Sequence, residues 1–583
     1  MRALLGGVLG LPLAAMLCGL LAAVIPVDWR DWLVLMMLLC LVFWAALILA
    51  VAANHHALRG CLMRVDTMKR QIDLHAWVGI VSGLALFVAF FAGAINMFHH
   101  ELHHWQEPWQ ASEPSDANMQ VLLDTVIARN PEAGNWMFLI PGDEPAAIWQ
   151  ERIDGEAVWH TEHASDFNDA GEAVERPHSE LAGFINELHF RLGIPVVGLY
   201  LMGVISVLYG AALIGGLVIH WPKMKKEFFA LKHQGNLRRY WKNLHNLVGV
   251  ISFPFHLIFA VTGAAMGCFA LITLTLGALA FGPQFQGAAT EAMEAWPTAQ
   301  ASGTAATMAP VDRYLATARE QLPEMDVGWI ELQQYGDQDA VVDVAGSVPG
   351  VVAHHAHVVM RADNAELLTV SAPGARPFNH FLLSPVYSLH FGDYGGLFVR
   401  LLYFVLGLLG CLLFVSGNIM WSERRTDRQG PSRAAAIMLR LTLGVTFGVM
   451  AGIAVSFMAN KLAMYSPWPG ATVVAEKAAF VATLLVAVLS AFRVPPLSTA
   501  RVWLPLCGAL YVLVPLLQGA IEGFASWLDP DRLRVNGALL AIAASLFLVD
   551  RLRAGRLRQA GPHPLWVGGI RPDATGPAEA GVA

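Results

Sequence analysis

Long apolar runs limit what this chain can fold into more than any other feature of its sequence. An apolar run of about 20 residues crosses the hydrocarbon of a bilayer as a helix, because no water is present there to hydrogen-bond the backbone. The chain has about ten such runs by that length rule, at 3–25, 32–53, 75–98, 195–221, 245–281, 395–421, 435–459, 473–491, 503–520 and 535–550. We therefore expect a polytopic α-helical membrane protein with about ten transmembrane helices. A signal peptide is the alternative for the first run, but that run is longer than a signal core and has no clear cleavage site.

The composition excludes several other classes. Hydrophobic residues make up 56% of the chain and charged residues 14%, whereas soluble domains carry about 25% charged residues. A soluble enzyme and a disordered chain are therefore excluded. The net charge of -7 argues against nucleic acid as a partner. The six cysteines stand alone, mostly within apolar runs, so neither a disulfide framework nor a zinc site is indicated.

Positive charges mark the cytoplasmic side of a membrane protein. Lys and Arg gather in four segments that share one side if the helices alternate: 54–72, 222–242, 422–434 and the tail after 550. The two long connections fall on the other side and are acidic. Residues 98–194 contain 18 Asp and Glu against 4 Arg, and residues 283–389 contain 12 against 4. We expect both termini in the cytoplasm and both acidic connections outside.

The middle of the chain contains an internal repeat. LHAWVGIVSGLALFVAFFAG begins at Leu74 and LHNLVGVISFPFHLIFAVTG at Leu244, and each run leads to an external connection. LHFRLG from Leu188 and LHFGDYGG from Leu389 follow the connections, and each opens a helix that ends in Trp. The repeat divides the chain into two N-terminal helices with a basic loop (1–72), a first unit (73–242), a second unit (243–425), and a four-helix extension with a cytoplasmic tail (426–583).

The two external connections predict similar small folds. Helical spacing at 117–130 precedes strand-like runs at 135–140, 146–152 and 157–161, and helical spacing at 310–322 precedes runs at 327–333, 340–345 and 351–360. We expect two small external α+β domains inserted in the repeat.

These motifs resemble the PepSY-associated transmembrane family. LHxxxG, LHFG, PFHLI…TG at 254–263, and IHW followed by the basic KMKKEFF occur in the order typical of that family over about 72–425. The resemblance implies PepSY-like external domains and a location in the bacterial inner membrane. The family includes iron-regulated membrane proteins and haem-containing ferrisiderophore reductases. The two N-terminal helices and HHELHH at 99–104 depart from the family pattern.

Four histidines are related by the repeat. His75 and His245 begin the inner ends of their helices, and His189 and His390 begin the outer ends. An ionisable residue at membrane depth is a functional candidate, and facing imidazoles on separate helices suit axial ligation of haem. We therefore predict two b-type haems held by these four residues; polar helix caps at the membrane surface are the alternative. Glycines four residues further on would leave room for a porphyrin: Gly79, Gly249 and Gly193.

Two other histidines are secondary haem candidates. His256 lies three turns into its helix, too deep for the membrane surface, but its counterpart in the repeat is Leu86. His220 corresponds to Met420, and either could bind iron. An aromatic belt at the membrane surface is the alternative for His220, because Trp221 follows it.

A histidine-rich run follows the third apolar helix. Its members form two pairs spaced by four residues, as in helical zinc sites: His99, His100, His103 and His104. They are candidate ligands for a transition metal or a ferric substrate. A solvated helix end is favoured instead, because the sequence places no third protein ligand.

Neither a nucleotide-binding motif nor a hydrolase motif is found, and no catalytic residue is assigned. The resemblance implies a haem-b oxidoreductase that passes electrons from quinol or a cytoplasmic donor to an external ferric chelate or siderophore. Two alternatives stay open. One is a haem-free iron or siderophore transporter or accessory protein, and the other is a non-catalytic PepSY scaffold or regulator.

Overall fold

The computed structural model describes residues 65–107, 116–142, 145–153, 156–167, 177–220, 237–282, 299–349, 355–373, 378–466, 470–560 and 563–567. The helices predicted at 3–25 and 32–53 lie outside these residues. The chain divides into two compact units. The helical unit comprises 65–108, 177–267 and 401–583, and the sheet unit contains 109–176 and 268–400.

The helices of the internal repeat have bounds close to the expected ones, with one exception. They are α4 (Val65–Asn96), α5 (His99–Gln106), α7 (Leu181–Arg191), α8 (Val197–His220), α10 (Leu237–Ile251), α11 (Phe253–Phe281) and α15 (Gly396–Arg424). We expect a single helix over 245–281, but α10 and α11 are bent by 70° where they join. Pro254 accounts for the break: it is the second residue of α11 and has no N–H to donate to the preceding turn.

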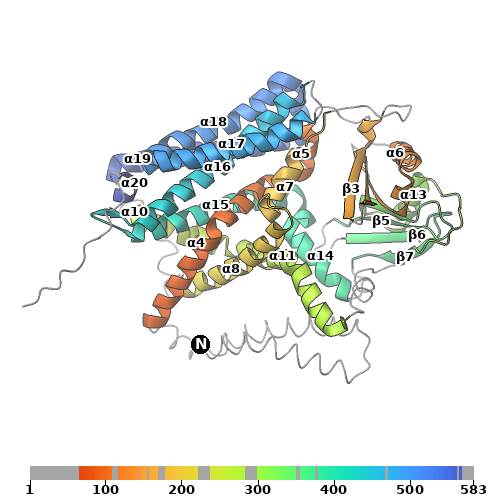
Figure 1. The fold of residues 1–583 in the computed structure, drawn as a ribbon, viewed down its shortest axis with the longest axis horizontal. Coiled ribbons are helices and arrows are strands. Elements are labelled where there is room, and N and C mark those ends of the chain that lie inside the picture. Colours follow the sequence, from red (N-terminus) through yellow and green to blue (C-terminus); the bar gives the residue numbers. More distant parts are fainter. Residues whose placement is uncertain are drawn as a thin grey trace, which may run out of the picture. The chain divides into compact units, whose positions relative to one another are not determined.

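The four C-terminal helices agree with the predicted runs. They are α16 (Arg433–Ala463), α17 (Ala471–Arg493), α18 (Pro496–Glu522) and α19 (Pro530–Ala560). α16 packs against α17 and α18, and α18 packs against α19 (Figure 1). The apolar segment of α16 is 78% buried and that of α17 only 22%. α16 is therefore the central helix of this group, while α17 leaves apolar side chains free to contact lipid.

Seven described helices are long and apolar enough to cross a membrane, and the bent α10–α11 pair makes eight if it counts as one span. These eight correspond to the eight apolar runs predicted within the described residues. The chain is therefore a multi-pass membrane protein in contact with the lipid bilayer.

One antiparallel sheet of seven strands forms the centre of the sheet unit. The strands are β1 (Trp136–Ile140), β2 (Ala146–Ile153), β3 (Glu156–His163), β4 (Asp326–Gln333), β5 (Val341–Ser347), β6 (His355–Arg361) and β7 (Leu367–Ser371). Their order is β3-β2-β1-β4-β5-β6-β7, so strands from the two connections meet where β1 pairs with β4. At this junction Met137 lies opposite Leu332.

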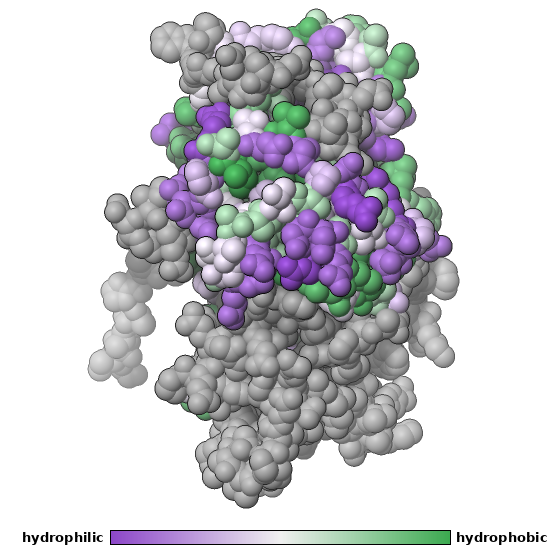
Figure 2. All heavy atoms as spheres, turned by 90° about the vertical axis from the view of Figure 1, so that its right-hand side faces the viewer, coloured by the Kyte–Doolittle hydropathy of each residue, from purple (hydrophilic) through white to green (hydrophobic). Residues whose placement is uncertain are grey.

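The two connections therefore share one domain where we expect two. α6 (Asp116–Arg129) and α13 (Val311–Gln321) pack on the sheet, and one core contains residues from both connections, among them Leu123, Leu139 and Val342. Burial explains the union, because a few short strands and one helix cover little of their own apolar surface. α14 (Phe378–Phe391) follows β7. Figure 2 faces this unit, and hydrophilic side chains predominate over its described surface.

Candidate functional site

His75 and His245, the first pair related by the repeat, lie together in the helical unit. His75 is on α4 and His245 on α10, with ring centres 6.2 Å apart and ring planes at 83°. Neither begins its helix as we expect, because α4 starts at Val65 and α10 at Leu237. Rings this close on two helices would let both imidazoles hold one haem iron.

A neighbouring helix holds each of these rings in the same way. His75 Nδ1 lies 2.8 Å from the carbonyl oxygen of Ala212 on α8. His245 Nδ1 lies 3.1 Å from the carbonyl oxygen of Leu413 on α15 and 3.1 Å from Ser416 Oγ. Because a carbonyl oxygen only accepts, Nδ1 carries the proton and Nε2 keeps its lone pair. A metal-binding imidazole uses this tautomer.

A glycine of the same neighbouring helix lies against each ring. A Cβ on Gly216 would lie 3.0 Å from His75 Cε1, and a Cβ on Gly417 would lie 3.3 Å from His245 Cε1. Each glycine follows the accepting carbonyl by four residues, so the arrangement recurs with the repeat. The sequence does not distinguish these glycines from the many others in the apolar runs.

The glycines predicted to make room for a porphyrin have different surroundings. A Cβ on Gly79 would meet nothing within 4 Å in the described part of the chain. A Cβ on Gly249 would make an ordinary contact with Leu413 at 3.5 Å. Gly193 instead has a φ of 69°, so the position suits a residue without Cβ where the chain leaves α7.

His189 repeats the same arrangement near the other end of α4. Its Nδ1 lies 2.8 Å from the carbonyl oxygen of Ala89, and a Cβ on Gly93 would lie 2.6 Å from that nitrogen. Burial lowers the pKa of His189 more than the hydrogen bond to Ala89 raises it, so the ring is neutral at pH 7. Ala89 follows His75 by 14 residues, which is about 21 Å along a helix. The helical unit thus has imidazole sites at two depths.

His390, the predicted partner of His189, belongs to the sheet unit. It is half-buried in the last turn of α14, and its ring centre lies 5.8 Å from that of Phe391. α7 and α14 both carry LHF in their last turns and end in left-handed residues, Leu192 and Gly193 after α7 and Gly392 after α14. We expect His189 and His390 to begin the outer ends of the long helices, but this is wrong: each lies at the end of a separate short helix, and α8 and α15 begin only at Val197 and Gly396. The left-handed glycine breaks the chain there. The pairing of the two histidines stays a prediction.

The two secondary candidates differ in their surroundings. His256 is fully buried, and neither ring nitrogen has a hydrogen-bond partner among the described residues. The ring centres of Phe90, Tyr209 and Phe255 lie 5.6, 5.9 and 5.5 Å from that of His256. Because an unpaired buried polar group costs free energy, His256 remains a candidate ligand. His220 is the last residue of α8 and is half-buried.

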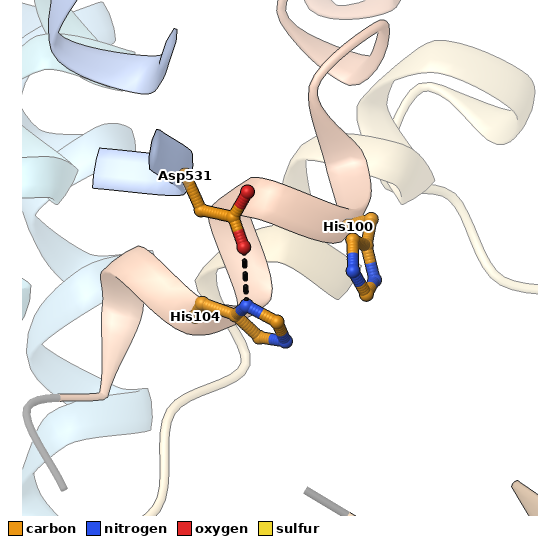
Figure 3. Close-up of side chains that lie close together, drawn as sticks. All are labelled: His100, His104 and Asp531. Carbon is orange, nitrogen blue, oxygen red and sulfur yellow. Dashed lines mark hydrogen bonds and ion pairs between the residues drawn. The ribbon is translucent and has the colours of Figure 1, made fainter. Parts of the chain in front are cut away.

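The histidines of α5 form the two predicted pairs. His99 Nε2 and His103 Nε2 are 3.3 Å apart, and the ring centres of His100 and His104 are 4.5 Å apart. The sequence offers no third side chain for these pairs, but the carboxylate of Asp531 on α19 lies beside the second pair (Figure 3). Its Oδ2 lies 2.6 Å from His104 Nδ1. The second pair therefore has a carboxylate partner from a distant part of the chain.

A buried charged network, which the sequence analysis does not anticipate, joins α5 to the C-terminal helices. Lys461 on α16 is fully buried, with Nζ 2.6 Å from Glu522 Oε1 on α18. The same Nζ donates to the backbone oxygen of Trp105 and lies 4.1 Å from the centre of its ring. Glu476 on α17 is also buried and accepts from Asn460 Nδ2 at 2.8 Å. Such groups are costly within a membrane unless they are paired.

Two comparisons with known proteins show which part of the chain has relatives. A family model described as the PepSY-associated TM region matches residues 72–424. A relative from Pseudomonas aeruginosa, named Uncharacterized protein PA4219, is 28% identical over 395 residues, which are 65% of this chain and 96% of the relative. The four predicted axial histidines lie within the matched residues, whereas α16–α19 lie beyond them.

Proposed function

Because this chain belongs to the family of the PepSY-associated transmembrane region, we propose that it is a haem-b reductase of the bacterial inner membrane. It passes electrons outward to a ferric chelate such as a ferrisiderophore, and so supports iron uptake. The repeated imidazole arrangement carries the proposal. At His75, His189 and His245, Nδ1 faces a helix carbonyl and a glycine lies against the ring.

His75, His189 and His245 of the helical unit fit a haem ligand set. Haem b supplies an iron that alternates between Fe(III) and Fe(II). His75 and His245 would hold one haem, and His189 and His390 a second. The helix carbonyls fix the orientations of the rings. By accepting the Nδ1 proton, they also make the lone pair of Nε2 a stronger electron donor to a metal ion. The facing glycines let each imidazole lie directly against the neighbouring helix backbone.

The charges along the chain support an outward direction. The basic segments 222–242 and 422–434 assign the His75 and His245 ends of their helices to the cytoplasmic side, where quinol or a cytoplasmic donor delivers electrons. His189 and His390 then lie toward the acidic external connections. The negative potential of those connections favours cationic or neutral ferric chelates over anionic ones.

Reduction explains how iron would be released. One electron converts chelated Fe(III) to Fe(II), and the softer Fe(II) binds anionic oxygen donors more weakly. The chelate then dissociates without any covalent change. The protein needs only to position the acceptor and to tune the potential of the cofactor.

Reoxidation by an external acceptor tests the proposal. We expect dithionite-reduced protein in oriented vesicles to be reoxidised by a ferric hydroxamate chelate added outside, with one Fe(II) released for each electron. NADH or NADPH alone should leave the oxidised protein unchanged. Added salt should weaken any preference for cationic chelates, because screening acts within about 8–10 Å at physiological ionic strength. Reoxidation by an internal acceptor alone would contradict the reductase function and favour the transporter.

A further inference from the structure

A separate group of ligand atoms lies on α5 and α19. We propose that His100, His104 and Asp531 bind a divalent first-row transition metal ion. Two imidazoles and one carboxylate suit Zn²⁺ and Fe²⁺, and such a set leaves at least one coordination position for water or another ligand. His100 is exposed, so an ion can reach the site from solvent.

The three side chains already converge (Figure 3). His100 and His104 lie one turn apart on α5, and Asp531 approaches from α19 with Oδ2 2.6 Å from His104 Nδ1. One ligand atom from each residue lies within 4.8 Å of the other two. Ligands of one tetrahedral ion with bonds of about 2.0–2.1 Å lie about 3.3 Å apart. Binding would therefore draw the three ligand atoms closer together.

Contacts outside the site hold α5 and α19 together. Trp105 is fully buried and its Nε1 donates to Asn536 Oδ1 at 3.0 Å. Arg534 Nη1 lies 2.8 Å from Asp531 Oδ1 and 3.4 Å from Glu101 Oε1. The contacts of Trp105 and Glu101 join α5 to α19. The contact between Arg534 and Asp531 lies within α19 and orients the carboxylate, as outer-shell partners do in metal sites.

The other pair on α5 provides an internal comparison. His99 and His103 have the same spacing on the same helix, with their Nε2 atoms 3.3 Å apart. Among the described residues, no third histidine, cysteine or carboxylate completes a group around that pair. Structural and catalytic zinc sites use three or four protein ligands. Within the described residues, His99 and His103 thus form a matched pair without a third candidate ligand.

Asp531 also gives the C-terminal extension a role. The family match ends at residue 424, yet α19 supplies one of the three ligands. The identity of the physiological ion rests on the proposed function. In the proposed orientation α5 follows the external end of α4, where reduction of a ferric chelate releases Fe(II). The site would therefore receive Fe(II) as it leaves the chelate.

Zinc binding to the full-length protein tests the site independently of reductase activity, because Zn²⁺ is not reduced. Protein purified without a histidine tag is dialysed against Zn²⁺, and bound zinc is measured by elemental analysis. We expect Asp531→Asn and His100→Ala to weaken zinc binding about 100-fold, and His103→Ala to leave it unchanged. Fe(II) added without oxygen to the zinc-free protein should bind at the same site, more weakly than zinc does.

The variants also separate a lost ligand from a lost fold. His100→Ala changes an exposed residue and should leave the thermal unfolding midpoint of the zinc-free protein unchanged. Asp531→Asn keeps the shape of the side chain but weakens its pairing with His104 and Arg534, so it should lower that midpoint only slightly. Full zinc binding by both variants would overturn the site. An equal loss in His103→Ala would overturn this ligand set in favour of the His99–His103 pair. Zinc binding as expected, without binding of Fe(II) to the zinc-free protein, would overturn only the link to the reductase.

Discussion

His245→Ala is expected to remove one haem, leave the other, and slow reoxidation by an external ferric chelate by at least about 100-fold. The histidine ring that lies 6.2 Å from His75 would be absent, so an iron bound to His75 would have no second imidazole. His75→Ala should remove the same haem. His189→Ala and His390→Ala should each remove the other haem. Pyridine haemochrome analysis measures the haem content of each variant.

A control and a subtler variant sharpen this test. His160→Ala changes a histidine of β3 that pairs with Glu151 at 3.0 Å, so haem content and reoxidation rate should remain at wild-type values. Gly417→Leu should lower the haem content without removing a ligand, because its Cβ would lie 3.3 Å from His245 Cε1. Full haem content in all four single histidine variants would exclude the proposed ligand pairs.

Features set by local pattern could be predicted from the sequence. Eight apolar runs match described helices because a bilayer forces each run to satisfy its own backbone hydrogen bonds. The repeat places His75 near His245, since equivalent helices of two similar units tend to pack in equivalent ways. The strands of the sheet unit also follow local spacing, as β1, β2 and β3 show.

Features that depend on distant residues were not predictable. Asp531 lies 427 residues after His104, and no local pattern marks it as a ligand. The pairing of β1 with β4 likewise depends on apolar surface left uncovered by each connection. Gly93, Gly216 and Gly417 differ from the other glycines of the apolar runs in that an imidazole from another helix lies against each of them. The local sequence does not show this. Lys461 stands near the end of an apolar run, where a lysine commonly extends its charged end toward water.

The burial of Lys461 leads to the largest expected change in stability. Its side chain is fully buried, and Glu522 is the carboxylate closest to it, 2.6 Å from Nζ. Glu522→Gln should lower the free energy of unfolding by about 3–5 kcal/mol, because it leaves a buried ammonium group without a negative partner. The added amide keeps the shape of the side chain, so packing changes little. Unfolding in detergent, followed by tryptophan fluorescence, measures the loss.

A double variant separates lost charge pairing from lost packing. Lys461→Met alone should cost less than Glu522→Gln, because Arg532 Nε still lies 3.5 Å from Glu522 Oε2. Adding Lys461→Met to Glu522→Gln should restore part of the stability, since the unpaired ammonium is then removed. If the two losses simply add, the pair contributes through packing alone. Partial recovery would instead show that the packing of α16 on α18 is stabilised by this buried charge pair. Lys461 also contacts Trp105, so the same side chain links both helices to α5.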